Sequence, residues 1–219
     1  MMYFTDICYV VHPVGRIVNG VVQLLGTAFF INKPGLLATA AHVVEYNDDN
    51  LVIVMNQIQS LQDYQDTSNN QIFTIPAKIK EINPINDVCI LEVSEKVKST
   101  FNIGSSDMVS VGQNISLFGY PHCNHGRMVL TQQNTSVGAK ILIKNNGIKN
   151  KNLILNIQSR PGQSGSPIIV PEQRLIVGIL IGSYAPHQKG GISLGGIDPQ
   201  TLHQTTHAIS AGYIEEMIK

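Results

Sequence analysis

Short apolar runs, rich in valine and isoleucine and separated by turn residues, recur along most of the chain. Many span about four to eight residues, a length that favours strands over helices. β-branched side chains fit the pleated surface of a sheet, so the pattern predicts an all-β protein folded as barrels or a sandwich. The clearest runs are 20–25, 51–54, 72–75, 115–118, 140–143, 168–170 and 175–180, and Asn145-Asn146-Gly147 predicts a hairpin turn.

A single helix is expected, at the C-terminal end. Ile209, Tyr213 and Met217 recur at intervals of four residues, the spacing of one helix face, and Ser210 is placed to cap its start. The sequence therefore predicts a short closing helix over 209–218.

Composition excludes several classes of function. Charged residues make up 14% of the 219 residues and the formal net charge is zero, so bulk charge points to no nucleic-acid or membrane partner. Three cysteines, Cys8, Cys89 and Cys123, are too few for a disulfide framework. The first residues have neither the basic start nor the apolar run of a signal peptide, and no stretch reaches transmembrane length, so we expect a cytoplasmic protein.

Gly162-Gln163-Ser164-Gly165-Ser166-Pro167 is the segment that carries the most chemistry. Glycines on both sides of a serine allow a tight turn and a close approach of the backbone to a substrate carbonyl. The N–H groups of Gly162 and Ser164 can then face one small space, as an oxyanion hole requires. Taken alone, the segment is equally typical of an ordinary polar loop.

Two upstream segments give this serine its partners. Thr39-Ala40-Ala41-His42 follows a predicted strand and turn, and Asn86-Asp87-Val88 opens another apolar run. The order histidine, aspartate, serine is the order of the chymotrypsin-type triad. No other aspartate between the histidine and the serine stands at the head of a buried strand.

With Gly26-Thr27-Ala28-Phe29 and Phe118-Gly119-Tyr120-Pro121, these segments span most of the chain. Together they resemble the trypsin-like serine proteases of the chymotrypsin fold, in particular the bacterial HtrA/Deg protease domain and the V8-like glutamyl endopeptidases. The resemblance implies two antiparallel β-barrels, residues 1–104 with His42 and Asp87 and residues 105–219 with Ser164 and the closing helix. It also implies a serine endopeptidase that works without a cofactor or metal and takes a protein or peptide substrate.

The resemblance assigns the catalytic roles residue by residue. His42 is the general base, Asp87 orients the imidazole, and Ser164 is the nucleophile of an acyl-enzyme mechanism. Gln163 stands where trypsin-type zymogens carry an aspartate that pairs with a newly cut N-terminus. Activation by N-terminal trimming is therefore not expected, which leaves constitutive activity, or control by loop ordering or by an activating protein partner.

Substrate recognition is implied at two places. Ile181-Gly182-Ser183 corresponds to the strand that pairs with the substrate backbone, and Gln158, Ser159 and His207 correspond to the walls of the S1 pocket. No aspartate is present to select Lys or Arg. If His207 faces the pocket, it favours an acidic or amide P1 side chain. A small aliphatic P1 side chain is equally compatible with the sequence.

Three alternatives remain open at this stage. One is a narrow processing protease with a single protein target, and another is a non-catalytic or partner-activated binding module on the protease fold. The third is a viral polyprotein protease, which the methionine start disfavours. His122-Cys123-Asn124-His125 offers too few ligands at too tight a spacing for a structural zinc site.

Overall fold

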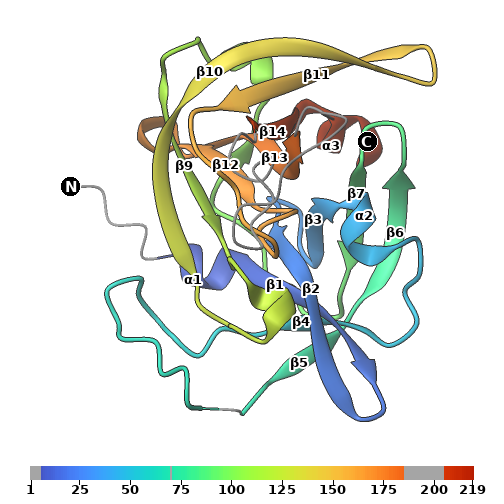
Figure 1. The fold of residues 1–219 in the computed structure, drawn as a ribbon. Coiled ribbons are helices and arrows are strands. Elements are labelled where there is room, and N and C mark those ends of the chain that lie inside the picture. The colour runs from blue at the N-terminus through green and yellow to red at the C-terminus, as the bar shows by residue number, and fades with distance from the viewer. Residues whose placement is uncertain (1–5, 70, 185–204) are drawn as a thin grey trace, which may run out of the picture.

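The computed structural model describes residues 6–69, 71–184 and 205–219 of the chain. Two seven-stranded sheets make up most of it, with few helices around them (Figure 1). The predicted all-β architecture of chymotrypsin type is therefore confirmed.

The first sheet has the strand order β5-β4-β1-β2-β3-β7-β6, and each neighbouring pair is antiparallel. Its strands are β1 (Val11–Val18), β2 (Val21–Phe30), β3 (Leu36–Ala40), β4 (Leu51–Val54), β5 (Thr74–Pro76), β6 (Lys78–Asn83) and β7 (Val88–Glu92).

The second sheet has the order β12-β9-β10-β11-β14-β13-β8, and a further pairing of β12 with β13 closes six of its strands into a ring. Its strands are β8 (Asn102–Ile103), β9 (Asn114–Gly119), β10 (Thr131–Asn145), β11 (Ile148–Leu155), β12 (Pro167–Val170), β13 (Leu175–Tyr184) and β14 (Thr205–Ser210). The short strand β8 already pairs with β13 of this sheet, while the predicted domain boundary between residues 104 and 105 stays a prediction.

The helices of the described residues are α1 (Ile7–Val10), α2 (Ala41–Val44) and α3 (Gly212–Met217). The C-terminal helix is thus present but shorter than predicted. Ile209 and Ser210 belong to β14, because they pair with Asn152 of β11 and Gly178 of β13, and this pairing prevails over the helical spacing. Within the described residues, no helix has both the length and the apolar character needed to span a bilayer.

Three clusters of buried side chains form the core. One fills the first sheet, around Phe30, and another fills the second sheet, around Leu153. The third lies between them and takes side chains from both, including Phe29 of β2 and Phe118 of β9. The shared cluster fixes the two sheets against each other, which is what a site built from both of them requires.

Tyr120 also joins the two halves through a polar contact. Tyr120 is 1% exposed, and its hydroxyl lies within hydrogen-bond distance of two acceptors, the Val11 carbonyl (3.1 Å) and the side-chain oxygen of Asn56. A buried phenol with both partners in the opposite half acts as a polar link within an apolar interface.

We predict that Tyr120→Phe lowers the free energy of unfolding by about 1–2 kcal/mol, because the partly buried side-chain oxygen of Asn56 loses its donor. Urea unfolding followed by circular dichroism measures the change. Tyr64→Phe is the matched control. The Tyr64 side chain is fully exposed, so the loss of its hydroxyl should leave the urea midpoint of unfolding unchanged. Equal midpoints for the two variants would contradict a linking role for Tyr120.

Candidate active site

His42 lies in the single helical turn α2, directly after β3. Ala41, Val43 and Val44 of this turn are buried, whereas His42 is exposed. The apolar neighbours anchor the turn in the core, so the one polar side chain between them faces solvent, with 46% of its surface exposed.

Asp87 holds this histidine by three contacts. Its carboxylate accepts from His42 Nδ1 (2.6 Å) and from the His42 main-chain N–H (2.9 Å), and its carbonyl accepts from the Ala41 N–H (3.1 Å). Because an ionised carboxylate only accepts, the shared proton belongs to Nδ1, which leaves Nε2 able to take a proton from a nucleophile. The structure thus places the predicted base and the predicted acid together.

The turn that carries Ser164 depends on glycine. Gly162 and Gly165 have φ angles of +89° and +88°, in the left-handed region. A Cβ on Gly165 would lie 1.9 Å from the Thr27 carbonyl oxygen and 2.4 Å from Thr39 Oγ1. The predicted need for glycine beside the serine therefore has a steric cause, which is the first sheet packed against the turn.

Thr27 of β2 is the residue on which this turn is docked. Its N–H donates to the Ser164 carbonyl (2.9 Å) and its hydroxyl donates to the Gly162 carbonyl (3.0 Å). The same hydroxyl accepts from the Tyr120 N–H (3.2 Å), and the Thr27 carbonyl accepts from the Thr39 hydroxyl (2.7 Å). One buried side chain of the first sheet thereby fixes the serine turn of the second.

Gly26, beside Thr27, brings the histidine and serine segments together. A Cβ at this glycine would lie 2.9 Å from the Val43 side chain and 3.0 Å from the Ser164 carbonyl oxygen. Val43 follows His42, so the two segments meet across a position that only glycine can occupy.

The orientation of the two N–H groups predicted to form an oxyanion hole follows from the carbonyl groups of the same peptide bonds. The Pro161 carbonyl accepts from the His122 N–H (2.6 Å), and the Gln163 carbonyl accepts from the Ser166 N–H (3.0 Å). In a trans peptide the N–H points away from the carbonyl, so the N–H groups of Gly162 and Ser164 point away from these partners. Neither makes a main-chain hydrogen bond within the described residues, so both can serve an outside acceptor.

The remaining contact of a triad would join Ser164 to His42. In the part of the chain that is described, no hydrogen bond joins the Ser164 hydroxyl to His42. Catalytic hydrogen bonds are often long in the absence of substrate and shorten when it binds. The structure therefore brings the segments of His42, Asp87 and Ser164 together and forms the first of the two links between their side chains.

Gln163, at the position of the zymogen aspartate, is fully buried. Its side-chain amide donates to the Gln133 side-chain oxygen on β10 (2.7 Å), and its own oxygen accepts from the Arg160 N–H (2.8 Å). Both ends of this amide are satisfied inside the chain, so the turn is braced without a charged partner.

Cys123 packs beneath the same turn. Its thiol contacts the Gly162 carbonyl oxygen (3.5 Å) and the Gly26 carbonyl oxygen (3.8 Å). Burial raises the pKa of this thiol to about 12, so it stays protonated and acts as a weak donor and packing group.

A small cavity opens beside Ser164. Its volume is about 230 Å³, and three of the predicted substrate-binding residues, Ser159, Gly182 and Ser183, line it together with Ser164. The sequence did not single out the remaining lining residues, Arg160, Pro161 and Leu180. It also missed Thr206, a buried residue whose hydroxyl accepts from the Ser159 N–H (2.9 Å) and donates to the Ile157 carbonyl.

Three other predicted substrate-binding residues lie outside the lining of this cavity. Gln158 is exposed, and Ile181 packs against the cluster of the first sheet and against the cluster shared between the sheets. His207 pairs with Gly182 across β13 and β14 and is partly buried, and desolvation lowers its pKa. Neighbouring residues on a strand point to opposite faces, so position along the chain alone does not place a side chain in the pocket.

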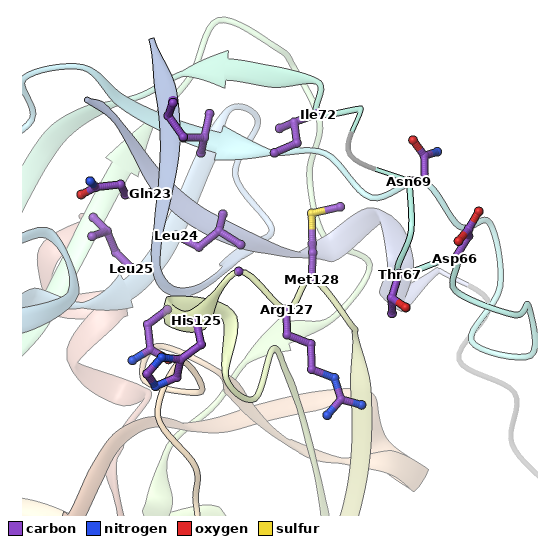
Figure 2. A pocket seen from close by; sticks show the side chains of 14 residues that line it. Gln23, Leu24, Leu25, Asp66, Thr67, Asn69, Ile72, His125, Arg127 and Met128 are labelled. Atoms are coloured by element: carbon purple, nitrogen blue, oxygen red, sulfur yellow. The ribbon is translucent and has the colours of Figure 1, made fainter. Parts of the chain in front are cut away.

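A larger groove of about 840 Å³ follows the free edge of β2 (Figure 2). Residues 21–24 of β2 pair with β1 on one side, whereas β3 pairs only with Phe29 and Phe30. Leu24 and Met128 are partly buried at the bottom of this groove, with Ile72 above them and Asp66 and Asn69 along one side. The groove leads along β2 toward Gly26, and so toward Ser164.

The family model described as a trypsin-like peptidase domain matches residues 26–179. The chain belongs to the trypsin-like peptidase domain family. The matched range contains His42, Asp87 and Ser164 and strands of both sheets. The resemblance seen in the sequence is confirmed, and the predicted enzyme class, a serine endopeptidase, agrees with this family.

A curated relative is also similar to this trypsin-like domain. A probable periplasmic serine endoprotease, DegP-like, of Pseudomonas fulva (strain 12-X) is 28% identical over 155 residues, which is 67% of this chain and 26% of that protein. The chain thus spans about a quarter of the length of this relative.

Solved structures share the fold at low sequence identity. The protease domain of MamO from Magnetospirillum magneticum (apo form) has a TM-score of 0.66 at 16% identity, with 96% of each chain covered. The Rv3671c protease of M. tuberculosis in its active form has a TM-score of 0.65 at 18% identity, covering 94% of this chain and 78% of that one. The HtrA-type protease AlgW with a decapeptide has a TM-score of 0.66 at 15% identity, covering 95% and 62%.

We predict that Thr27→Val slows the reaction of Ser164 with a fluorophosphonate by about 10- to 100-fold. The loss of the hydroxyl frees the Gly162 carbonyl, and a small misplacement of a catalytic group is enough to cause a loss of this size. Thr27→Ser keeps the hydroxyl and should react at nearly the wild-type rate. Stopped-flow or timed mass spectrometry gives the rates, and an equal loss in both variants would show that the hydroxyl does not hold the turn.

Proposed function

We propose that this chain is a serine endopeptidase that cleaves peptide bonds through His42, Asp87 and Ser164. The observation that carries the proposal is the 2.6 Å contact of Asp87 with His42 Nδ1, made beside a serine turn that is docked on Thr27. That contact sets the tautomer which a general base needs, in the family where this arrangement is used for acyl transfer.

Each step assigns one task to one group. Nε2 of His42 takes the proton of the Ser164 hydroxyl as the serine oxygen bonds to the scissile carbonyl carbon. The N–H groups of Gly162 and Ser164 donate to the resulting oxyanion, and the Asp87 carboxylate stabilises the imidazolium. The C–N bond then breaks as Nε2 gives its proton to the leaving amine. Water, deprotonated by His42 in turn, hydrolyses the acyl-enzyme.

The cavity beside Ser164 supports a small P1 side chain. Its volume is small, and its lining includes two hydroxyls from Ser159 and Ser183. Among the described residues Arg160 is the one charged member of the lining, and no carboxylate is there to bind Lys or Arg. His207, the residue that would favour an acidic P1, lies outside this lining. Of the two P1 classes left open by the sequence, the small one therefore has the better support.

The groove along β2 supports binding of the leaving-group side of the substrate as an extended strand. Val22 and Leu24 lie on an edge that no other strand covers in the described residues, and an extended peptide can pair with such an edge. Leu24, Met128 and Ile72 provide apolar surface for a large side chain on that segment. Selection of the substrate side chain in the cavity beside Ser164 and in the groove along β2 fits a processing enzyme of restricted specificity. Such a processing role is part of the proposal.

The proposal extends to how the enzyme is regulated and where it is located. The bracing of Gln163 inside the chain supports an enzyme that needs no N-terminal trimming. The open link between His42 and Ser164 leaves room for closure by substrate or by a protein partner. A cytoplasmic location remains our expectation, and the DegP-like relative is named as periplasmic.

We predict that a fluorophosphonate adds once to the wild-type chain and not to Ser164→Ala, as read by intact mass. Asp87→Asn should slow labelling by about 10⁴-fold, because the amide no longer holds the base in the required tautomer. An unlabelled wild-type chain that is folded would instead support the binding-module or partner-activated alternative.

We also predict that a peptide library shows cleavage after small residues, with large apolar residues favoured on the leaving-group side. Met128→Ala should reduce kcat/KM for the large-apolar peptides by about tenfold, the effect expected when an aliphatic contact is lost. Matched peptides with alanine at that position serve as the control and should be unaffected. A preference that Met128→Ala leaves intact would exclude the groove as its source.

A further inference from the structure

The long hairpin of β10 and β11 extends beyond the sheet that it belongs to. β14 pairs with β11 only over Asn152–Leu155, so no further strand of the described residues lies beside the outer part of the hairpin, residues 142–151. It ends in a tight turn at Asn146 and Gly147, which have φ angles of 48° and 86°. The tip reaches toward the connection between β6 and β7 of the first sheet (Figure 1).

Two asparagines of this hairpin bind one carbonyl of that connection. The side-chain amide of Asn150 donates to the Ile85 carbonyl oxygen (2.8 Å), and that of Asn145 donates to the same oxygen (3.1 Å). Asn150 is 3% exposed although Lys149 and Lys151 on either side of it are exposed. A carbonyl oxygen has two lone pairs, so both acceptor sites of Ile85 are filled from the second sheet.

The bound carbonyl lies in the loop that presents the catalytic acid. This loop, residues 84–87, joins β6 to β7, and its other side is held by Asn83, whose side-chain oxygen accepts from the N–H groups of Ile85 and Asn86 (3.1 Å each). Asp87 follows two residues after Ile85 with a φ of 54°, a left-handed conformation that an aspartate keeps only where its surroundings fix it. The loop is thus gripped between Asn83 of its own sheet and Asn150 of the other.

We infer that Asn150, assisted by Asn145, is a positioning residue for Asp87, so that the hairpin of the second sheet sets the orientation of the catalytic acid of the first. The inference rests on the proposed function in one respect, which is that the proposed function assigns Asp87 the role of the catalytic acid. The amide holds the peptide of Ile85, the fixed peptide holds Asp87 in its left-handed conformation, and that conformation directs the carboxylate at His42. Asn150 contacts no reacting atom and acts only through Asp87.

The test compares three variants of the full chain: Asn150→Ala, Asn150→Asp, which keeps the shape but has no N–H to donate, and Asn145→Ala. Two readouts are used, steady-state kinetics on a short peptide and the far-downfield proton NMR resonance of His42 Nδ1–H. We expect Asn150→Ala and Asn150→Asp to lower kcat by about 10- to 100-fold with little change in KM, as for other misplaced catalytic groups. The resonance should shift or broaden in both, and less so in Asn145→Ala.

Asn134→Ala is the matched control. Asn134 lies on β10, and its side-chain oxygen accepts two hydrogen bonds, from Ser116 Oγ (2.8 Å) and from the Gln132 amide (3.0 Å), neither of them near the loop of Asp87. It should keep the wild-type kcat and resonance.

Wild-type kcat and an unchanged resonance in the Asn150 variants would overturn the inference, as would an equal loss in Asn134→Ala. If the Asn150 variants do not fold, Asn145→Ala decides, because its exposed side chain is dispensable for the core and an unaltered resonance in it refutes the proposal. The NMR signal needs no turnover, so a wild-type chain without peptidase activity would refute the proposed function and still allow this test.

Discussion

The contact between Thr27 and the serine turn is the interaction on which the site depends. A serine hydroxyl becomes useful only at one position relative to a base, and here that position is set by a residue of the opposite sheet. Thr27 binds the turn at both Gly162 and Ser164, and the bare glycines at 26 and 165 allow the two backbones to approach this closely. The packing of the sheets against each other is therefore what places the Ser164 turn, and on the proposed function catalysis depends on it.

The support runs in both directions across the cleft. The first sheet fixes the nucleophile through Thr27, and by our inference the second sheet fixes the acid through Asn150. The buried apolar cluster around Phe29 and Phe118 provides the close-packed contact between these polar links. Each sheet thus holds a loop of the other: the first holds the turn of Ser164, and the second holds the loop of Asp87.

Local chemistry made part of this site predictable from the sequence. Valine- and isoleucine-rich runs predicted the strands, and the order histidine, aspartate, serine made His42, Asp87 and Ser164 stand out. Thr27 lies in a segment that supported the resemblance, but neither its contacts nor those of Asn150 were predicted, because a threonine or an asparagine on a strand has no distinctive neighbour in sequence. Their partners lie 135 and 65 residues away, a separation that only the folded chain reveals.

The errors have a similar origin. Ile209 and Ser210 fit a helix by their spacing but pair as a strand, because β11 and β13 offer hydrogen bonds on both sides. The roles of His207 and Ile181 at the substrate stay predictions, and neither residue lines the cavity beside Ser164. Strand register and bulges decide which face a residue occupies, and one such irregularity lies between Leu180 and Gly182.

The division of the site between two sheets also governs when a newly made chain can act. Synthesis proceeds from the N-terminus, so β1 to β7, with His42 and Asp87, leave the ribosome before the hairpin of β10 and β11 and the turn of Ser164. A half-finished chain therefore contains the proposed base and acid but not the proposed nucleophile, and the Ser164 turn, once made, is held in place only after it reaches Thr27. On the proposed function, activity would thus begin only when both sheets have folded against each other.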